Sequence, residues 1–367
     1  MNKKLKVAVY AICKNEEQFV DKWMDSMQEA DVIVVADTGS TDQTVEKLKG
    51  RGAKVYSIKI DPWRFDLPRN ISLNFVPEDV DVCVCTDLDE VFEPGWREKI
   101  ENVWTENTTK INYMYTWKFN PDGSKGSTFW RGKIHRRHGY RWVHPVHEVL
   151  YYHGPGEEKI VWERSIQLNH FPDNTKSRGQ YLPLLELSVK EDPDYLVNLF
   201  YLGREYMYYN KWDESMKTLE IFLNKPEATW KDQRSAAMRF IARGHLKKGN
   251  TLVAKSWFYN AIAEAPHLRE PYVEMAKLAH SEKNWPLVYA MVENGLKITT
   301  KKATYLTEAA AWDYTLYDLG SLSCYYLGML DKSLDLSKKA LEMSPENVRL
   351  QNNYTLIKNA LDRKNQN

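Results

Sequence analysis

The sequence predicts an α/β domain with a mostly parallel sheet, followed by an all-helical domain of repeated helix pairs. Short apolar runs at residues 5–12, 31–36 and 54–60 alternate with stretches of helical periodicity, as in βαβ units. From about residue 195 the apolar residues recur at helical spacing and few strand candidates remain. The helical stretches also repeat as a two-helix unit, which is typical of repeat proteins.

Size and composition fit a folded protein of about two domains, with 367 residues, 43% hydrophobic residues and a net charge of +1. This charge gives no general attraction to nucleic acid or to anionic membranes. The apolar run at the start is too short for a signal peptide, and no stretch reaches the roughly 20 apolar residues of a spanning helix. The four cysteines match neither a zinc pattern nor an evident disulfide framework. We therefore expect no membrane span and a cytoplasmic location.

The predicted boundaries are residues 1–175 for the α/β domain, 176–193 for a helical linker and 194–367 for the repeats. In chain order, the elements expected in the first domain are a strand at 5–12, a helix through Phe19, Trp23 and Met27, a strand at 31–36, a helix through Val45 and Leu48, a strand at 54–60, a helix at 63–75, a strand at 80–85 and a strand at 161–170.

An acidic cluster, Asp87-Leu88-Asp89-Glu90, follows the apolar run at residues 80–85 after a single residue, Thr86. Carboxylates at the end of a buried strand are costly without a counter-charge. Side chains alternate along an extended chain, so Asp87 and Asp89 would point one way and Leu88 the other. Mg²⁺ and Mn²⁺ prefer such oxygen ligands, and open α/β sheets bind ligands beyond the carboxyl ends of their strands. The alternative is a polar turn without function, because Asp-x-Asp alone is common.

Four motifs in a fixed order strengthen the functional interpretation: residues 7–17, 34–44, 67–70 and 86–90. Their order resembles the family 2 glycosyltransferases, and the resemblance covers residues 5–172. It implies a GT-A fold, a Rossmann-like α/β domain that binds a nucleotide-sugar and a divalent metal. One departure is that Thr38 follows Asp37 where many members carry a second acid, which leaves the preference for the donor base open.

The resemblance also implies roles for individual residues. Asn15 and Glu16 would border the donor pocket, Asp37 would contact the nucleoside, Arg69 would contact the base or a phosphate, Asp87 would face the ribose or the metal, and Asp89 would be a metal ligand. The expected donor is a nucleoside diphosphate-sugar, with UDP as the expected nucleotide, and the expected cofactor is Mn²⁺ or Mg²⁺. For Arg69, the alternative on the residue alone is a surface salt bridge.

Residues 126–148 combine many cationic side chains with interleaved aromatic rings. Such a segment could bind single-stranded nucleic acid, or it could hold a diphosphate and a sugar; we favour the second interpretation and assign Arg137 and Trp142 to donor binding. The segment 136–148 is similar to the acceptor side of a subfamily that includes lipopolysaccharide-core enzymes and peptide S-glycosyltransferases. This similarity implies that Glu148 is the catalytic base of an inverting transfer; the alternative is a paired structural carboxylate.

A histidine, His170, closes the strand expected at residues 161–170. It stands where the family would supply a further protein ligand to the metal, and imidazole occurs in mixed sites with carboxylates. A lone histidine is more often structural, and His144 and His147 compete for the same role.

The helical half has a repeat spacing of about 34 residues with small, aromatic and Pro positions, and it resembles tetratricopeptide repeats. The expected helix pairs are 194–206 with 211–223, 236–248 with 252–265, 271–281 with 286–297, and 310–327 with 332–343, followed by a capping helix at 348–361. Such arrays present surfaces for partner proteins or for self-association.

The prediction for the whole chain is a metal-dependent inverting glycosyltransferase whose repeats help to present an acceptor, which is a peptide, a glycan or a modified nucleobase. One alternative is a non-catalytic repeat scaffold with a vestigial α/β domain, although clustered charges are costly in a site without use. Another is a transferase that modifies a DNA base, which predicts salt-sensitive DNA binding.

Overall fold

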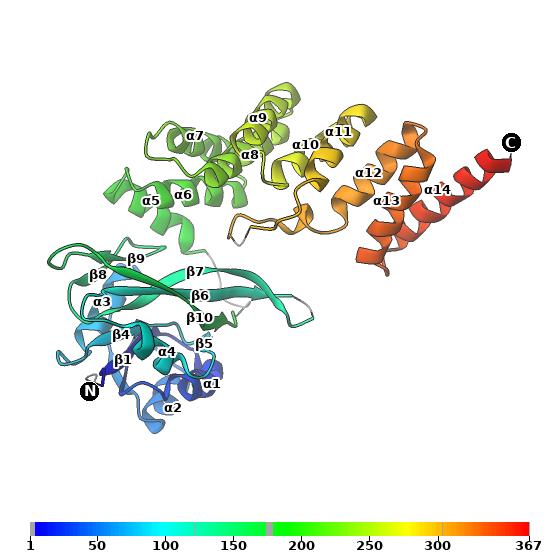
Figure 1. Cartoon of the computed structure of the whole chain (residues 1–367). Coiled ribbons are helices and arrows are strands. Elements are labelled where there is room, and N and C mark those ends of the chain that lie inside the picture. Colours follow the sequence, from blue (N-terminus) through cyan, green and yellow to red (C-terminus); the bar gives the residue numbers. More distant parts are fainter. Residues whose placement is uncertain (1–3, 121, 174–178, 303, 367) are drawn as a thin grey trace. The chain divides into compact units, whose positions relative to one another are not determined.

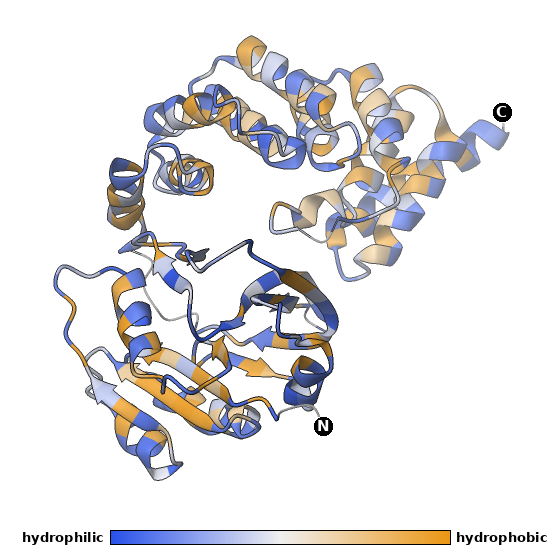
Figure 2. Ribbon diagram, turned by 60° about the vertical axis from the view of Figure 1, so that its left-hand side comes forward, coloured by the Kyte–Doolittle hydropathy of each residue, from blue (hydrophilic) through white to orange (hydrophobic). Residues whose placement is uncertain are grey.

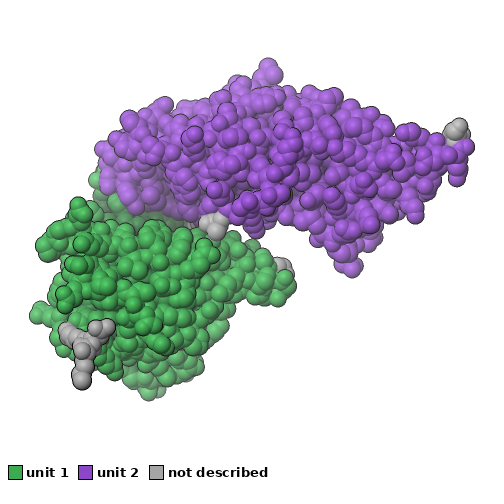
Figure 3. Space-filling model, in the orientation of Figure 1, with its two compact units in different colours: residues 1–191 green, residues 192–367 purple. Residues whose placement is uncertain are grey.

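The computed structural model describes residues 4–120, 122–173, 179–302 and 304–366. The chain divides into two compact units, Met1–Glu191 and Asp192–Asn367 (Figure 3). Helix α5 (Tyr181–Glu191) lies within the stretch predicted as a linker and belongs to the first unit. Residues 174–178, which span the predicted domain boundary, lie outside the described residues.

The first unit is built around a mixed sheet with helices on both faces (Figure 1). Its strands are β1 (Val7–Cys13), β2 (Val32–Asp37), β3 (Lys54–Ser57), β4 (Val82–Cys85), β5 (Glu90–Phe92), β6 (Lys110–Phe119), β7 (Lys125–Arg136), β8 (Tyr140–Val143), β9 (Val149–Tyr152) and β10 (Ile160–His170). Besides α5, its helices are α1 (Glu17–Met27), α2 (Thr44–Gly50), α3 (Asp66–Asn74) and α4 (Trp96–Val103).

The sheet has the strand order β3-β2-β1-β4-β7-β6-β10-β5, and β8 and β9 form a separate hairpin. Strands β3, β2, β1 and β4 run parallel. Strand β7 is antiparallel to both β4 and β6, and β10 is parallel to β6. Two antiparallel steps restore the original direction, so β10 ends at the same edge of the sheet as β1, β2 and β4. The carboxyl ends of these four strands therefore meet at one edge, where open α/β sheets bind ligands.

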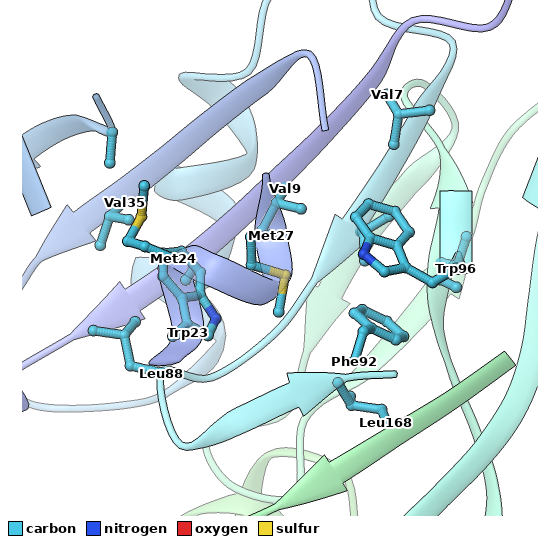
Figure 4. Packing of buried hydrophobic residues seen from close by; sticks show 14 of the residues in the cluster. Val7, Val9, Trp23, Met24, Met27, Val35, Leu88, Phe92, Trp96 and Leu168 are labelled. Atoms are coloured by element: carbon cyan, nitrogen blue, oxygen red, sulfur yellow. The ribbon is translucent and has the colours of Figure 1, made fainter. Parts of the chain in front are cut away.

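Alternating side chains of β1 fill two separate apolar layers, one on each face of the sheet. Val7, Val9 and Ala11 pack with α1, α2 and α4, whereas Ala8 and Tyr10 pack with α3 and the β8–β9 hairpin. On the first face, Phe92 stacks on Trp96 at a centroid distance of 5.1 Å (Figure 4). Leu88 points into the same layer beside Trp23 (Figure 4). It does so from a turn, in which the Glu90 N–H donates to the Asp87 carbonyl at 3.0 Å, and not from the extended chain on which the predicted alternation rested.

The second unit consists of paired helices with a final helix at the end. The helices are α6 (Leu196–Tyr208), α7 (Trp212–Leu223), α8 (Lys231–Lys247), α9 (Thr251–Glu264), α10 (Glu270–Ser281), α11 (Trp285–Leu296), α12 (Thr315–Tyr326), α13 (Leu330–Met343) and α14 (Val348–Gln366), with one 3₁₀ turn, η1 (Ala309–Ala311), before α12. The first helices of successive pairs, α6, α8, α10 and α12, contact one another.

The first and the last helix pair each contain an equivalent hydrogen bond from a serine hydroxyl to a backbone carbonyl. Donor and acceptor are separated by the same number of residues in both pairs, as expected for a repeated unit. The Ser215 hydroxyl donates to the Gly203 carbonyl, and the Ser333 hydroxyl donates to the Ser321 carbonyl, each at 2.7 Å. In Figure 2 the strands of the sheet are mostly hydrophobic, whereas the helices alternate between hydrophobic and hydrophilic residues. Among the described helices, none combines the length and the apolar character needed to cross a membrane.

The predicted fold class is confirmed: a mixed, mostly parallel α/β sheet precedes an all-helical region of paired, tetratricopeptide-like helices. Several details differ from the sequence prediction, and α4, β8 and β9 were not predicted. Strands β5, β6 and β7, which complete the far half of the sheet, had no predicted counterpart. Strand β3 ends at Ser57 rather than at residue 60, and the helix expected from residue 310 begins only at Thr315. Tertiary contacts of residues 304–311, described below, hold that segment out of the helix.

Candidate active site

Asp37 ends β2 and organises the loop that follows it. Its carboxylate is almost completely buried and accepts the backbone N–H groups of Gly39, at 3.2 Å, and of Ser40, at 3.1 Å. Gly39 has a φ of +105°, a conformation that favours glycine. The Cys13 thiol donates to the same carboxylate at 3.6 Å, and burial raises the pKa of this thiol far above its ordinary value. Asp37 therefore shapes the turn at the carboxyl edge of the sheet.

Asn15 and Glu16 join the loop after β1 to the loop after β2. The Asn15 side-chain oxygen accepts the Thr41 backbone N–H at 2.7 Å, and the Asn15 N–H donates to the Ser40 hydroxyl at 2.9 Å. The Glu16 N–H donates to the Thr44 hydroxyl at 2.8 Å, and the Glu16 residue is buried. The structure thus places Asn15, Glu16 and Asp37 together, as two linked loops at one edge.

Arg69, on α3, is the centre of a buried ionic network. Its Nη2 lies 2.8 Å from Asp87 Oδ1, and its Nε donates to Glu148 Oε1 at 2.5 Å. Its Nη1 contacts Cys85 Sγ at 3.5 Å, and the guanidinium lies over the Trp142 ring. The structure therefore brings together Arg69 and Asp87, which the sequence assigned to donor binding, and Glu148, which it assigned to catalysis. Arg69 is not a surface salt bridge.

Lys133 is a second buried cation in this network, and the sequence interpretation did not select it. Its Nζ lies 3.0 Å from Asp87 Oδ2 and 3.4 Å from Glu90 Oε1. Burial acts to raise the pKa of Asp87, but the charges of Arg69 and Lys133 outweigh burial and hold it far below its ordinary range. The Asp87 carboxylate is thus ionised and shared between two cations. Lys133 belongs to the cationic segment 126–148, and this clustering of positive charge was the sequence signal that could have identified it as a site residue.

Asp89 and His170 form a pair beside this network. His170 Nε2 lies 3.3 Å from Asp89 Oδ2, because β10 pairs with β5 so that His170 stands opposite Glu90. The other ring nitrogen, Nδ1, hydrogen-bonds the Trp117 carbonyl at 3.1 Å, and the ring stacks on Trp117 at 4.4 Å. A carbonyl only accepts, so Nδ1 carries a proton and Nε2 faces the carboxylate.

This donor set fits a divalent cation. Burial acts to lower the pKa of His170, but the hydrogen bond to Asp89 and its charge outweigh burial and raise it. The gap between the two side chains thus favours a positive charge, either a proton or a metal ion. A carbonyl that fixes the tautomer of a ligating histidine is usual at metal sites. Within the described residues, no set of three or more His, Cys, Asp or Glu side chains is arranged to hold a metal, so the remaining ligands would be phosphate oxygens and water.

Arg137 and Trp142 lie elsewhere than the sequence interpretation implied. The Arg137 guanidinium donates to the Val76 carbonyl, at 2.8 Å from Nη2, and so fastens the chain after α3. Trp142 is buried in the second apolar layer, where its Nε1 donates to the Tyr10 hydroxyl at 2.8 Å. Trp142 reaches the network only through the face of its ring, against Arg69.

His144 and His147 lie on the loop before Glu148, and both have a positive φ. The His147 ring lies 6.0 Å from the Tyr181 ring. Of the three histidines considered for the metal, His170 is the one that the structure places against Asp89.

Comparisons with known proteins give similarities of general architecture. The sequence matches no model of a known protein family. MamA has 17% sequence identity and a TM-score of 0.37, over 46% of this chain and 89% of that chain. A TPR protein of Thermus thermophilus has 17% identity and a TM-score of 0.33, over 48% and 88%. The glucosyl-3-phosphoglycerate synthase of Mycobacterium tuberculosis has 23% identity and a TM-score of 0.27, over 30% and 44%. TM-scores below 0.5 identify neither a family nor an activity.

Proposed function

We propose that the first unit is an inverting glycosyltransferase that uses a nucleoside diphosphate-sugar, with UDP as the expected nucleotide. One observation carries the proposal: at the carboxyl edge of the sheet, the Asp89–His170 pair lies beside the buried network of Arg69, Asp87, Lys133 and Glu148. A carboxylate–imidazole pair suits a divalent cation, and buried cations suit a diphosphate.

In this proposal Asp89 and His170 would hold Mn²⁺ or Mg²⁺. A divalent cation supplies charge neutralisation for the leaving diphosphate. The protein's own cations serve the same end, because the buried cations Arg69 and Lys133 are both fixed by the partly buried carboxylate of Asp87 before any ligand arrives. Donors that are oriented in advance stabilise developing charge without the cost of reorganisation.

Glu148 is the proposed base. The acceptor's nucleophile attacks the anomeric carbon, the bond from that carbon to the diphosphate oxygen breaks with its electron pair, and the acceptor's proton passes to Glu148. Oxygen Oε1 of Glu148 accepts from Arg69, so we assign the proton to Oε2.

The test of the proposed function is a thermal-shift screen of the full chain with UDP-, GDP- and dTDP-sugars, each with and without Mn²⁺. A UDP-sugar with Mn²⁺ is expected to stabilise the protein by about 2.7 kcal/mol when present at about 100 times its Kd. Slow Mn²⁺-dependent hydrolysis of the same sugar is the second readout. A scaffold with a vestigial domain would show neither result, and that outcome would reject the proposal.

Substitution Glu148→Gln is expected to lower Mn²⁺-dependent hydrolysis of the UDP-sugar by about 100-fold or more, because glutamine cannot take up the proton. Binding of UDP with Mn²⁺, measured by calorimetry, should change far less. Glu101→Gln is the matched control, since Glu101 lies on α4 and pairs with Arg97, four residues before it on the same helix. Full hydrolysis by folded Glu148→Gln protein would show that Glu148 is a structural partner of Arg69.

A further inference from the structure

The connection between α11 and α12 differs from the other connections in the helical unit. It spans residues 297–314, whereas the next longest, between α7 and α8, spans residues 224–230. The connection runs back from α11 toward α8 before it returns to α12 (Figure 1). We call its described part from Thr304 to Ala311 the strap. The strap lies against the first helices of the first three pairs, as its contacts show.

Glu308 of the strap is held by two arginines of α8. Its Oε1 accepts from Arg239 Nη1 at 2.7 Å, and its Oε2 accepts from Arg243 Nη2 at 2.6 Å. The Arg239 side chain is only 1% exposed, and Arg243 also pairs with Glu274 of α10 at 2.7 Å. The backbone N–H of Glu308 donates to Glu270, also on α10, at 3.2 Å. Glu308 therefore engages two neighbouring helices, α8 through its side chain and α10 through its backbone N–H.

Tyr305 of the strap lies among aromatic rings three residues before Glu308. Its ring centroid is 5.7 Å from that of Tyr201, on α6, and 5.9 Å from that of Trp230, which directly precedes α8. Its hydroxyl accepts a hydrogen bond from Gln233 Nε2 at 3.0 Å. The face formed by α6, α8 and α10 thus contacts an aromatic residue and, three positions later, an acidic residue of the strap.

The strap is held mainly by polar and ring contacts. Leu306 and Ala311 are its buried apolar residues, while Ala309 is exposed. In the described structure, Arg239 Nε is buried without a hydrogen-bond partner, so Glu308 satisfies only part of the donors on this face. A tethered segment has an effective concentration in the millimolar range. Polar and ring contacts within the chain therefore hold the strap in place, and a free segment at a comparable concentration still competes for the same face.

We propose that the strap is an intramolecular ligand: the face of α6, α8 and α10 recognises an aromatic residue followed three positions later by an acid, and the strap occupies this face until a partner segment of the same pattern displaces it. The partner class is therefore a protein with an exposed aromatic–acidic segment. The inference does not depend on the transferase chemistry of the first unit.

The test uses a fluorescent peptide with the sequence of residues 304–312, Thr-Tyr-Leu-Thr-Glu-Ala-Ala-Ala-Trp, and the full-length chain. A variant with a weakened strap, Tyr305→Ala with Glu308→Gln, is expected to bind the peptide at least about 10-fold more tightly than the unmodified chain in fluorescence polarisation, since the face is released. A peptide with glutamine in place of its glutamate should lose about 10-fold in affinity for the same variant. The control is Glu342→Gln, an exposed acid paired with Lys338 on α13, which should behave as the unmodified chain.

A second measurement needs no variant. Excess unlabelled peptide, added to the unmodified chain, should speed amide hydrogen exchange in residues 304–311 and leave exchange in α13 and α14 unchanged. If the weakened variant binds no more tightly than the unmodified chain, or if excess peptide leaves exchange in the strap unchanged, the strap is a permanent structural segment and the proposal is rejected.

Discussion

Substitution of Asp89 by alanine is expected to abolish the Mn²⁺-dependent part of UDP-sugar binding, with a loss in affinity of at least about 100-fold. The reason is geometric, because Asp89 supplies the carboxylate that faces His170 Nε2 at 3.3 Å. Without it, a single imidazole remains as protein ligand, and a hard cation binds a lone nitrogen poorly. Isothermal calorimetry of UDP, with and without Mn²⁺, measures the effect directly.

The control for this substitution is Asp79→Ala. Asp79 is an exposed acid that pairs with Lys6 at the opposite end of β4, so its loss should leave Mn²⁺-dependent binding unchanged. Both variants should melt within a few degrees of the unmodified chain, since both side chains are partly exposed. Equal Mn²⁺-dependent affinity of Asp89→Ala and the unmodified chain would contradict the metal site.

The half of the sheet that was predictable from sequence is the half with local signals. Strands β1, β2 and β4 are continuous apolar runs, and each ends in polar residues, so both the strands and the edge that they share follow from pattern alone. Strands β6 and β7 mix aromatic and charged residues, because part of each strand faces solvent. Their alternation is interrupted by irregularities in register, which hid the strand period.

The site residues also divide into those with a local sequence signal and those whose position depends on strand pairing. Asp37 and the pair Asp87 and Asp89 stand just after apolar runs, so their edge position was readable. The approach of His170 to Asp89 depends on the pairing of β10 with β5, two strands far apart in sequence, and only the family resemblance suggested it. Lys133 was missed because its direction depends on the register of β7 against β4, which has no local signal.

The strap shows a tertiary contact that overrides a local preference. Three consecutive alanines, Ala309–Ala311, favour a helix, and the sequence predicted one from residue 310. In the structure these residues form a single 3₁₀ turn, since the neighbouring Glu308 is fixed by Arg239 and Arg243. Helix α12 therefore begins only at Thr315.

Substitution of Arg69 by methionine is expected to destabilise the first unit by about 3–5 kcal/mol, because it removes one partner from a buried ionic network. Methionine retains much of the apolar stem, so the loss reports on charge. Asp87 would keep Lys133, but Glu148 would lose the cation that its Oε1 contacts. Arg51→Met is the matched control: Arg51 also bridges two carboxylates, Asp21 and Asp25, but on the surface, where the loss should be below about 1 kcal/mol.

The measurement for Arg69 is urea unfolding, with the transitions of the two units followed separately. A second substitution distinguishes charge from packing: Glu148→Gln in the Arg69→Met background removes the uncompensated carboxylate and should recover roughly 1–2 kcal/mol, whereas Glu148→Gln alone should destabilise. Only an ion pair would make Glu148→Gln destabilising by itself and stabilising in the Arg69→Met background. If the two substitutions were independent packing defects, their losses of stability would add. If Arg69→Met costs no more than Arg51→Met, the network at the carboxyl edge does not stabilise the fold, and the orientation of Arg69 and Lys133 in advance of donor binding loses its physical basis.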